Sequence, residues 1–340
     1  MIKANYEIGP YKRILLLGGG ELLLRLAKWA KESGFDIAVV TAPRHASETI
    51  GGATFEQALT TIGTEFVVSE KLDSAVLQRF LIHPSETFSL SLGAAWIFDD
   101  KMIKDVFQEN LFNLHGTRLP QDRGGGGFSW QILTGNRFGF CNIHKMEAGI
   151  DQGAIVFSRE FLYPVGCRTP KQYTDIYVER SFEFITQFLL ELKKHKKTIE
   201  ALAQPEYLSS YWPRLNTEIN GWIDWRWAPW HLERFICAFD DPYAGAHTLW
   251  NDQRIFLKKA SVNFQDAHFH PFQAGLVYRK AAGWICIATA GGGLVIEQIT
   301  DEANADLIGR ISVGDRLHTP SHLLDDATRR VVYSPRGIKD

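Results

Sequence analysis

The chain has few of the features that mark disulfide-rich, metal-binding or membrane-spanning proteins. Its 340 residues include only four cysteines, Cys141, Cys167, Cys237 and Cys286, and no two of them form a Cys-x-x-Cys pair. We therefore expect no metal site, and we expect the four cysteines to be reduced thiols. No apolar run reaches the roughly 18 residues that a membrane span requires, and the apolar stretch near the N-terminus is too short for a signal peptide. The sequence predicts a cytoplasmic protein with no membrane segment.

A charge excess of either sign is also absent. The chain has 37 Lys and Arg against 39 Asp and Glu, a formal net charge of −2. This balance creates no global basic field, which argues against a nucleic-acid partner. A helical pattern over 171–197 ends in KKHKK, which could form a local nucleic-acid patch but is also the cation cluster that a helix C-terminus favours. The length suits two domains better than one.

The first half alternates strand and helix patterns. Apolar runs at 13–17 and 36–41 flank Gly18–Gly20 and a helical pattern over 21–33. This βαβ pattern predicts a parallel sheet. It continues with helices at 55–62 and 72–82 and strands at 65–68 and 87–92.

The glycines of this first unit do not form a dinucleotide motif. GGGELLL lacks the order G-x-G-x-x-G, so a tight packing turn is favoured over a nucleotide site. Arg44 and His45 follow the second strand and could meet an anionic acceptor, or simply lie in a solvated loop.

The densest chemistry lies in residues 110–155. Asn113 and His115 stand two residues apart at the end of an apolar run, so both side chains leave the same face of the predicted strand. Asp151 follows in a loop with Gly153. An amide and an imidazole can hold a carbonyl oxygen as its carbon becomes tetrahedral, and a carboxylate can orient the imidazole or accept a proton. The trio suits acyl transfer or hydrolysis, although Asn-x-His is often structural and Asp-x-Gly is a common turn.

The segment NLHGTRLPQDRG, followed later by GIDQGAIV, adds specificity to this interpretation. It resembles the signature N-x-H-G-S-L-L-P-x-x-R-G…D-x-G of the 10-formyltetrahydrofolate-dependent formyltransferases, with Thr117 and Arg118 as departures. The resemblance implies that Asn113, His115 and Asp151 are catalytic and that 10-formyltetrahydrofolate is the donor. It also implies a set of cofactor-binding residues: Ala95, Trp96, Ile97, Arg123, Gly124 and Gly149.

The second half resembles the C-terminal part of two-domain formyltransferases in its GWIDW and DPYAGAHT segments. Short strand patterns at 246–250, 254–261, 275–280, 284–288 and 293–299 predict a small β-barrel. We therefore expect an α/β protein with a doubly wound, mainly parallel Rossmann-like sheet and a smaller OB-like β-barrel domain. The expected division is a catalytic domain over 1–204, a linker over 205–213, the barrel over 214–310 and a tail over 311–340.

The resemblance is greatest to the nucleotide-sugar branch of the family. It implies that the acceptor is a small-molecule primary amine on a dTDP-, UDP- or GDP-linked amino sugar. Four alternatives stay open at this point: a methionyl-tRNA formyltransferase, an amino-acid formyltransferase of siderophore or natural-product assembly, a 10-formyltetrahydrofolate hydrolase, and a non-catalytic ligand-binding relative. A homodimer through the C-terminal part is compatible with the sequence, but no residue requires it.

Overall fold

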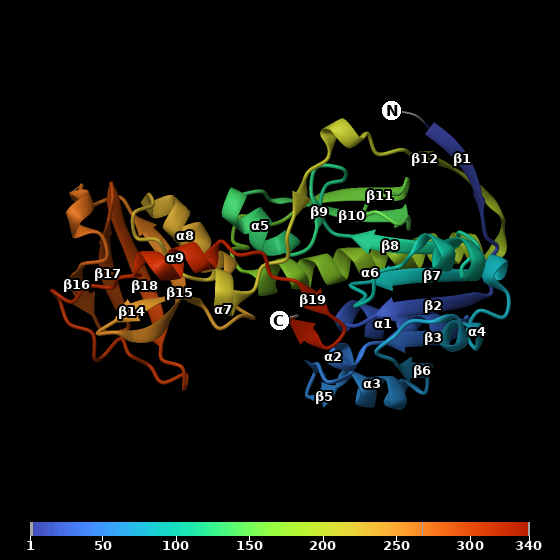
Figure 1. Ribbon diagram of the computed structural model, residues 1–340, viewed down its shortest axis with the longest axis horizontal. Helices are drawn as coiled ribbons and strands as arrows, with labels where there is room; N and C mark the ends of the chain where they lie inside the picture. Colours follow the sequence, from blue (N-terminus) through green and yellow to red (C-terminus); the bar gives the residue numbers. More distant parts are fainter. Residues whose placement is uncertain (1–2, 267, 339–340) are drawn as a thin grey trace.

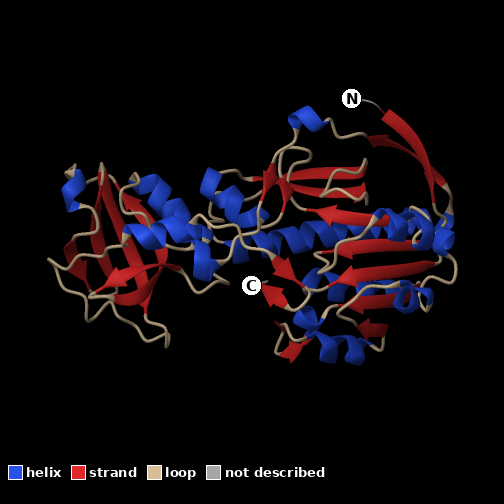
Figure 2. Cartoon of the chain, viewed as in Figure 1, coloured by secondary structure: helices blue, strands red, loops and turns tan. Residues whose placement is uncertain are grey.

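The computed structural model describes residues 3–266 and 268–338, and its long axis runs through two parts (Figure 1). The larger part is built on a nine-stranded sheet covered by helices, and the smaller on a five-stranded antiparallel sheet (Figure 2). The predicted α/β class with a smaller C-terminal β part is confirmed.

The large sheet is mixed rather than mainly parallel. Its order is β1-β12-β11-β10-β8-β7-β2-β3-β6. The parallel strands are β2 (Arg13–Gly18), β3 (Asp36–Thr41), β6 (Glu65–Val68), β7 (Thr87–Leu92) and β8 (Leu111–His115). The antiparallel extension consists of β10 (Phe138–Lys145), β11 (Ile155–Leu162), β12 (Lys197–Leu202) and β1 (Lys3–Ile8). β7 is buried along its whole length, and its sequence TFSLSL accordingly contains no charged residue.

Helices cover both faces of this sheet, as a doubly wound fold requires. One core cluster includes residues of α1 (Glu21–Glu32), α3 (Phe55–Ile62) and α6 (Pro170–Lys194). A second cluster, on other side chains of the same strands, includes residues of α4 (Ser74–Gln78) and the π-helical turn η2 (Met102–Val106). The helix predicted over 72–82 is thus shorter than expected. The predicted helix over 171–197 ends at Lys194, because Lys197 already begins β12.

The turn after β2 packs tightly against a neighbouring loop. A Cβ added to Gly19 would lie 2.6 Å from the Cβ of His45, which belongs to α2 (Pro43–Ala46). His45 in turn places Nε2 3.2 Å from the Gly93 carbonyl oxygen and Nδ1 2.7 Å from Glu48 Oε1. The glycines therefore permit close packing at the sheet edge. Short elements nearby are β4 (Thr49–Ile50), β5 (Ala53–Thr54) and η1 (Pro84–Glu86).

The C-terminal sheet has the order β14-β15-β18-β17-β16. Its strands are β14 (Ala246–Trp250), β15 (Gln253–Asn263), β16 (Val277–Ala281), β17 (Trp284–Thr289) and β18 (Gly292–Thr300), with η4 (Pro271–Gln273) between β15 and β16. The helix α8 (Pro229–Ala238) shares a core cluster with these strands.

Residues 314–318 close this sheet into a barrel. The His318 N–H donates to the Leu249 carbonyl on one edge strand, and the Leu317 N–H donates to the Gly275 carbonyl beside the other edge. The expected tail over 311–340 thus includes a segment that hydrogen-bonds to both edges of this sheet. The backbone pairing shows this contact, which no residue pattern in the segment predicts.

The segment between the two parts follows the glycine-rich turn closely. After η3 (Glu206–Leu208), β13 (Tyr211–Trp212) pairs in parallel with β9 (Arg123–Gly124), just before α5 (Gly127–Thr134). α7 (Thr217–Asn220) follows. The predicted linker over 205–213 is therefore hydrogen-bonded to the catalytic part along its second half.

The last described residues return to the larger part (Figure 1). α9 (Ser321–Ala327), β19 (Tyr333–Ser334) and β20 (Gly337–Ile338) make up this tail. Arg44 Nη1 donates to the Ser334 carbonyl oxygen at 3.2 Å, and Arg336 pairs with Glu70 at 2.6 Å. The tail thus links the barrel to the loops at the edge of the large sheet.

Within the residues that the structure describes, no helix has the length and apolar character needed to cross a membrane.

Candidate active site

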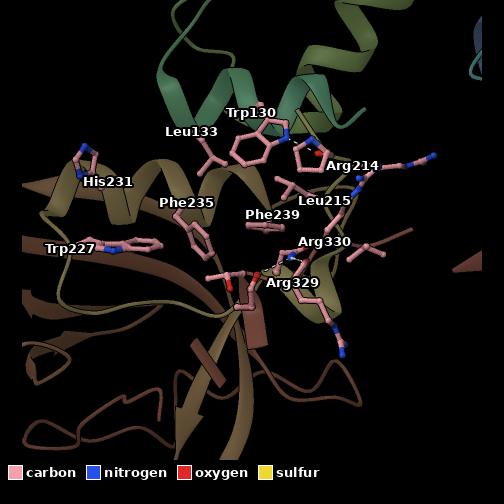
Figure 3. Close-up of a pocket in the computed structure, with 15 residues that line it drawn as sticks. Trp130, Leu133, Arg214, Leu215, Trp227, His231, Phe235, Phe239, Arg329 and Arg330 are labelled. Carbon is pink, nitrogen blue, oxygen red and sulfur yellow. Dashed lines mark hydrogen bonds between the residues drawn. The ribbon is translucent and has the colours of Figure 1, made fainter. Parts of the chain in front are cut away.

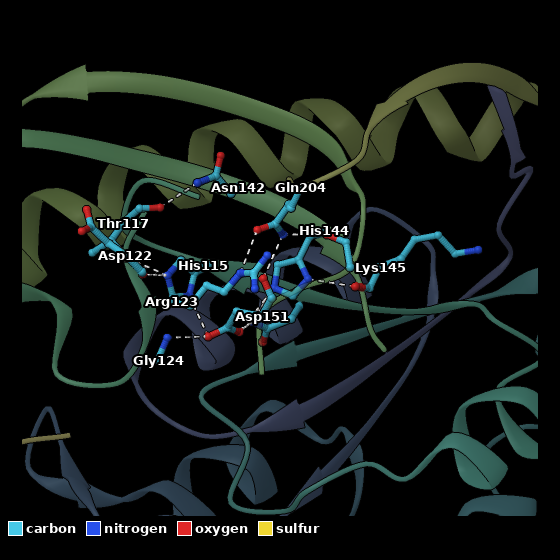
Figure 4. Close-up of polar contacts among 12 residues, drawn as sticks. His115, Thr117, Asp122, Arg123, Gly124, Asn142, His144, Lys145, Asp151 and Gln204 are labelled. Carbon is cyan, nitrogen blue, oxygen red and sulfur yellow. Dashed lines mark hydrogen bonds and ion pairs between the residues drawn. The ribbon is translucent and has the colours of Figure 1, made fainter. Parts of the chain in front are cut away.

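The candidate site lies where the parallel strands β7 and β8 end and the antiparallel strand β10 passes beside them. Ser91 is in register with Asn113 across β7 and β8, and His144 is in register with Asn113 across β10 and β8. Open α/β sheets bind ligands outside the carboxyl ends of their strands. The loop after β10 brings Asp151 to this same edge (Figure 4).

The Asp151 carboxylate is the centre of the site. Its Oδ1 lies 3.3 Å from Asn113 Nδ2 and 3.5 Å from His144 Nε2. Its Oδ2 accepts the Gly124 N–H at 2.9 Å and lies 3.6 Å from His115 Nδ1. The three residues predicted to be catalytic, together with Gly124, therefore come together in the fold.

The backbone of the Asp151 loop is fixed by its neighbours. Asp151 itself has a left-handed φ of 50°, a conformation that costs a non-glycine residue energy. Gln204 Nε2 donates to the carbonyl oxygens of Asp151 at 2.8 Å and Gly153 at 2.7 Å. A Cβ on Gly153 would lie 1.9 Å from the Lys145 carbonyl oxygen. The D-x-G spacing thus puts the Asp151 carboxylate in the same turn as Gly153, whose backbone packs closely against Lys145.

The surroundings of Asp151 keep it ionised. Burial alone would raise its pKa, but the neighbouring imidazoles of His144 and His115 and the Gly124 N–H outweigh burial and lower the pKa to about 2. The site therefore carries a fixed negative charge at neutral pH. Such a charge can hold a cationic group or stabilise one that forms during a reaction.

His115 is held as a neutral ring with one free nitrogen. Its Nε2 lies 2.6 Å from the Asp122 carbonyl oxygen and 2.7 Å from Thr117 Oγ1, which itself donates to that carbonyl. A carbonyl can only accept, so Nε2 carries the proton and the neutral ring leaves Nδ1 facing Asp151. Burial lowers the pKa of His115, and the nearby Asp151 only partly offsets this. His115 Nδ1 is consequently available to take a proton beside a carboxylate.

His144 is a member of the site that the sequence reasoning missed. It is fully buried, and its Nδ1 lies 2.8 Å from the Lys145 carbonyl oxygen, to which it donates. Its Nε2 then accepts from Asn113 Nδ2 at 3.1 Å. A histidine shortly before the D-x-G turn was the available signal. Only the register of β10 against β8 places it opposite Asn113.

The Asn113 amide is already engaged inside the site. Its Nδ2 reaches both His144 Nε2 and Asp151 Oδ1. An amide nitrogen has two hydrogens to donate. Asn113 would have to release one of these acceptors to donate to a substrate oxygen, so its oxyanion role remains a prediction.

Arg123 points toward the linker side of the site rather than to the surface. Its Nη1 donates to Glu206 Oε2 at 2.7 Å and its Nε to Gln204 Oε1 at 3.2 Å. Gln204 is the residue that holds the Asp151 loop. Arg123 therefore supports Asp151 indirectly, and its predicted contact with the cofactor remains a prediction.

The two predicted glycines differ in what they do. Gly124 has a φ of 102°, and a Cβ there would lie 2.3 Å from the Trp212 carbonyl oxygen. Only glycine lets this strand approach the linker while its N–H donates to Asp151. Gly149 lies in the Asp151 loop, where a Cβ would meet the side chain of Gln152.

The predicted folate-binding segment Ala95–Ile97 lies in the loop after β7. Trp96 Nε1 donates to the Glu70 carbonyl oxygen at 3.0 Å, and its ring packs against the core beside α4. Ile97 is 92% exposed. In the described part of the chain, no hydrogen bond or ion pair joins this segment to the Asp151 cluster. The segment shares the sheet edge with the cluster but is not part of it.

Comparison with known proteins agrees with the resemblance in sequence. Residues 216–309 match the family described as formyl transferase, C-terminal domain. Methionyl-tRNA formyltransferase of Desulfotalea psychrophila is 28% identical over 204 residues, which are 59% of this chain and 60% of the relative. The chain thus spans less than two thirds of the length of this relative.

Solved structures share the fold. The sugar 3N-formyl transferase WlaRD, solved with dTDP and 5-N-formyl-THF, matches with a TM-score of 0.61 and 17% identity over 84% of this chain and 97% of its own. The N-formyltransferase of Helicobacter canadensis, in complex with folinic acid and dTDP-3-aminofucose, matches with a TM-score of 0.61 and 16% identity over 85% and 99%. These two structures show that the chain has the fold of sugar N-formyltransferases.

Proposed function

We propose that the protein transfers a formyl group from 10-formyltetrahydrofolate to a primary amine. The observation that carries this proposal is the Asp151 cluster, where an ionised carboxylate, a neutral imidazole and an amide meet at the ligand-binding edge of the sheet. The family relationship supports the reaction type and the donor.

In the proposed reaction, the amine nitrogen attacks the formyl carbon of the donor and forms a tetrahedral intermediate. His115 Nδ1 takes the proton that the attacking nitrogen loses, and the ionised Asp151 stabilises the resulting imidazolium. The bond between the formyl carbon and N10 of the folate then breaks, and N10 gains a proton as tetrahydrofolate leaves. Asn113 donates to the carbonyl oxygen while it carries negative charge.

His144 has a positioning role in this scheme. Because its Nδ1 proton is tied to the Lys145 carbonyl, its Nε2 accepts from Asn113 and turns the NH₂ end of that amide toward Asp151. Loss of this ring would leave the amide free to rotate. The effect on the rate should be smaller than that of losing Asn113 itself.

The acceptor that we propose is a nucleotide-linked amino sugar. Two structural neighbours are sugar N-formyltransferases solved with dTDP or a dTDP-amino sugar. Methionyl-tRNA is the second candidate, because curated sequence relatives are methionyl-tRNA formyltransferases. The chain's formal net charge of −2 favours the small acceptor, since a tRNA partner benefits from a basic surface.

The test is to incubate the protein with 10-formyltetrahydrofolate and follow the release of tetrahydrofolate. Parallel reactions contain dTDP-, UDP- and GDP-linked amino sugars, methionyl-tRNA, free amino acids, or no amine. Release with an amino-sugar nucleotide supports the whole proposal, and release with methionyl-tRNA or an amino acid supports only formyl transfer. Release without any amine would instead identify a hydrolase.

The Asp151→Asn variant tests the site, and Asp175→Asn is the matched control. Asp175 lies on the surface of α6 in an ion pair with Lys171, so its loss should change no step of the reaction. If both variants release tetrahydrofolate as fast as the unmodified protein, the proposed site is wrong.

A further inference from the structure

A cavity of about 470 Å³ lies between the two parts of the molecule (Figure 3). Its walls come from α5, from the segment after the linker, from α8 and from the tail at 327–331. None of Asn113, His115 and Asp151 lines it. Its size falls in the range of small-molecule sites, and the proposed reaction does not by itself explain it.

Three arginines line this cavity: Arg214, Arg329 and Arg330. All three are exposed, and within the described residues no carboxylate forms an ion pair with any of them. Arg214 lies over the ring of Tyr333 at 4.6 Å, and Arg330 lies over the ring of Tyr211 at 5.5 Å. The stacking orients these two guanidinium groups, and Arg330 Nη2 also donates to the Tyr211 hydroxyl at 3.4 Å. The remaining N–H donors can bind an anion.

A fourth arginine lies near the same cluster. Burial and the positive charge of Arg214 lower the pKa of Arg44, and the charge of Glu48 partly offsets this. Other arginines of the molecule have acidic partners, as Arg254 does with Glu218 and Glu302. A group of neighbouring arginines without ion pairs attracts a negatively charged ligand.

Aromatic rings form the opposite wall. Trp130, Phe235 and Phe239 line the cavity from α5 and α8, with Trp227 at its side (Figure 3). Trp130 Nε1 donates to the Pro213 carbonyl oxygen at 2.8 Å, which fixes the plane of the indole. Flat apolar faces beside guanidinium groups suit a planar ring that carries phosphate groups, since bases stack on aromatic rings and phosphates bind arginine.

The tail is held in place as a wall of this cavity. Asn220 Nδ2 donates to the carbonyl oxygens of Ala327 at 2.8 Å and Arg329 at 3.1 Å. Tyr333 donates through its hydroxyl to the Leu215 carbonyl oxygen at 3.2 Å. The backbone that carries Arg329 and Arg330 is therefore anchored on both sides of the two arginines.

The cavity adjoins the Asp151 cluster through the glycine-rich turn. Gly124 donates to Asp151, and two residues later a Cβ on Gly126 would lie 3.2 Å from the Leu215 nitrogen. Leu215 lines the cavity. One short stretch of backbone thus contacts the carboxylate at one end and the cavity wall at the other.

We infer that this cavity binds the nucleoside diphosphate of the acceptor, with the base against the aromatic wall and the phosphates on Arg214, Arg329 and Arg330. The inference rests on the proposed function in its choice of acceptor. It assigns to the C-terminal tail a direct part in substrate binding.

The first test measures binding without any folate. The full-length protein is titrated with dTDP, UDP, GDP and ADP by calorimetry, with inorganic pyrophosphate as the phosphate-only probe. We expect at least one nucleoside diphosphate to bind, and to bind more tightly than pyrophosphate because stacking adds to the phosphate contacts. Equal affinity for pyrophosphate would overturn the assignment of the aromatic wall.

Two variants locate the site. Arg329→Gln combined with Arg330→Gln removes the cations, and Thr328→Trp fills the cavity from an exposed position that lines it. Each change should weaken nucleoside diphosphate binding by about tenfold or more, which is at least the effect of losing one charge-assisted contact. Arg310→Gln, an exposed arginine on the barrel side, is the matched control and should bind normally.

Steady-state kinetics separate this inference from the proposed function. With an amino-sugar nucleotide as acceptor, the double arginine variant should raise KM about tenfold and change kcat less than about twofold. If formyl transfer occurs but no nucleoside diphosphate binds, or if the variants bind it unchanged, the inference is wrong while the proposed function stands. If the nucleotide binds as expected but no amine is formylated, the proposed function fails and the cavity assignment survives.

Discussion

The Asp151 cluster and the arginine cavity differ in how their charged groups are buried and paired. Around Asp151 nearly every polar group is buried and already paired: the carboxylate accepts from Asn113 and Gly124 and lies beside two buried histidines. In the cavity the arginines are exposed and have no acidic partner among the described residues. A prepaired, water-poor cluster suits chemistry, because its dipoles need not reorganise. An open cluster of unpaired charges suits binding, because the ligand supplies the missing partner.

The largest expected effect follows from removing the charge at the centre of the paired cluster. Asp151→Asn keeps the shape of the side chain but leaves the protonated His115 without its counter-ion. We expect kcat to fall about 1000-fold, within the range typical of acid–base groups. Tetrahydrofolate release under saturating substrates measures this. A fall of less than about tenfold would mean that the cluster is structural.

The next largest effect on kcat distinguishes the Asn113 amide from the His144 ring that positions it. Asn113→Ala should reduce kcat about 100- to 1000-fold, as the loss of an oxyanion donor does. His115→Ala should do the same, with folding retained in both. His144→Gln should cost less, about tenfold, because glutamine can still accept from Asn113. Equal losses for the variants at 113 and 144 would contradict the assignment of His144 as a positioning residue.

The pH dependence of the reaction tests the neutral state of His115. Its pKa lies below the ordinary histidine value of 6.5, so the ring is neutral above that pH and the rate should be flat there. As pH falls below 6.5 the ring gains a proton and kcat should decline. Asp151, with a pKa of about 2, stays ionised over this pH range and causes no further change in the pH–rate profile. A rate that rises as the pH falls below 6.5 would exclude His115 as the base.

The same pKa shift has a consequence for stability. Because the folded-state pKa of His115 is lowered, the unfolded chain binds the proton more readily, and stability is lost as pH falls below about 6.5. Asp151 acts in the same direction at lower pH: its folded-state pKa is lowered from 3.8 to about 2, so it stabilises the protein above pH 3.8 and this contribution is lost as the pH falls toward 2. Thermal unfolding of the unmodified protein and of His115→Gln between about pH 5 and 8 measures the first effect.

A stability effect of intermediate size tests the loop that carries Asp151. Gly153→Ala would place a Cβ 1.9 Å from the Lys145 carbonyl oxygen and force the loop to move. We expect a loss of about 2 kcal/mol in the free energy of unfolding, together with reduced activity because Asp151 moves with the loop. Gly166→Ala is the matched control, since a Cβ there meets nothing within 4 Å. Equal melting temperatures for the two variants would contradict the proposed role of Gly153.

The smallest effect distinguishes the two sites by their response to salt. Exposed charges are screened by salt and buried pairs much less so. Raising the salt from about 0.1 M to about 1 M should weaken nucleoside diphosphate binding at the arginine cavity severalfold. The kcat measured at saturating acceptor should change less than about twofold. If kcat falls as much as the affinity, the two sites do not differ in the way that their burial suggests.

Much of the fold could be predicted from local sequence. The strands 65–68, 87–92 and 246–250 and the helix 55–62 coincide with β6, β7, β14 and α3, because each is a compact apolar or amphipathic run between turn residues. β1 and β12 were missed. β1, KANYEI, forms the edge of the sheet and pairs with β12, KTIEAL. Polar and charged residues interrupt the apolar ones in both strands, so neither has the apolar run by which a strand is recognised.

The three candidate catalytic residues could be predicted from the sequence, but their arrangement could not. Asn113, His115 and Asp151 could be identified because the spacing N-x-H and D-x-G resembles a family signature. The cluster itself depends on the register of β10 against β8 and on the left-handed turn at Asp151, which bring residues from 113 to 151 onto one carboxylate. His144 enters the site only through that register. A local sequence pattern does not show which residues of two neighbouring strands lie opposite each other.

The sequence by itself determined the α/β class, the C-terminal strands, the resemblance to a family and the cluster members Asn113, His115 and Asp151, since all of these follow from local periodicity or from short motifs. Tertiary structure alone decided that residues 314–318 close the barrel and that the tail returns to the large sheet. It also decided that Arg214, Arg329 and Arg330, more than 100 residues apart at the extremes, line one cavity with Trp130. Each of these is a contact between segments distant in sequence, and such contacts are fixed by the packing of the whole chain rather than by any stretch of it.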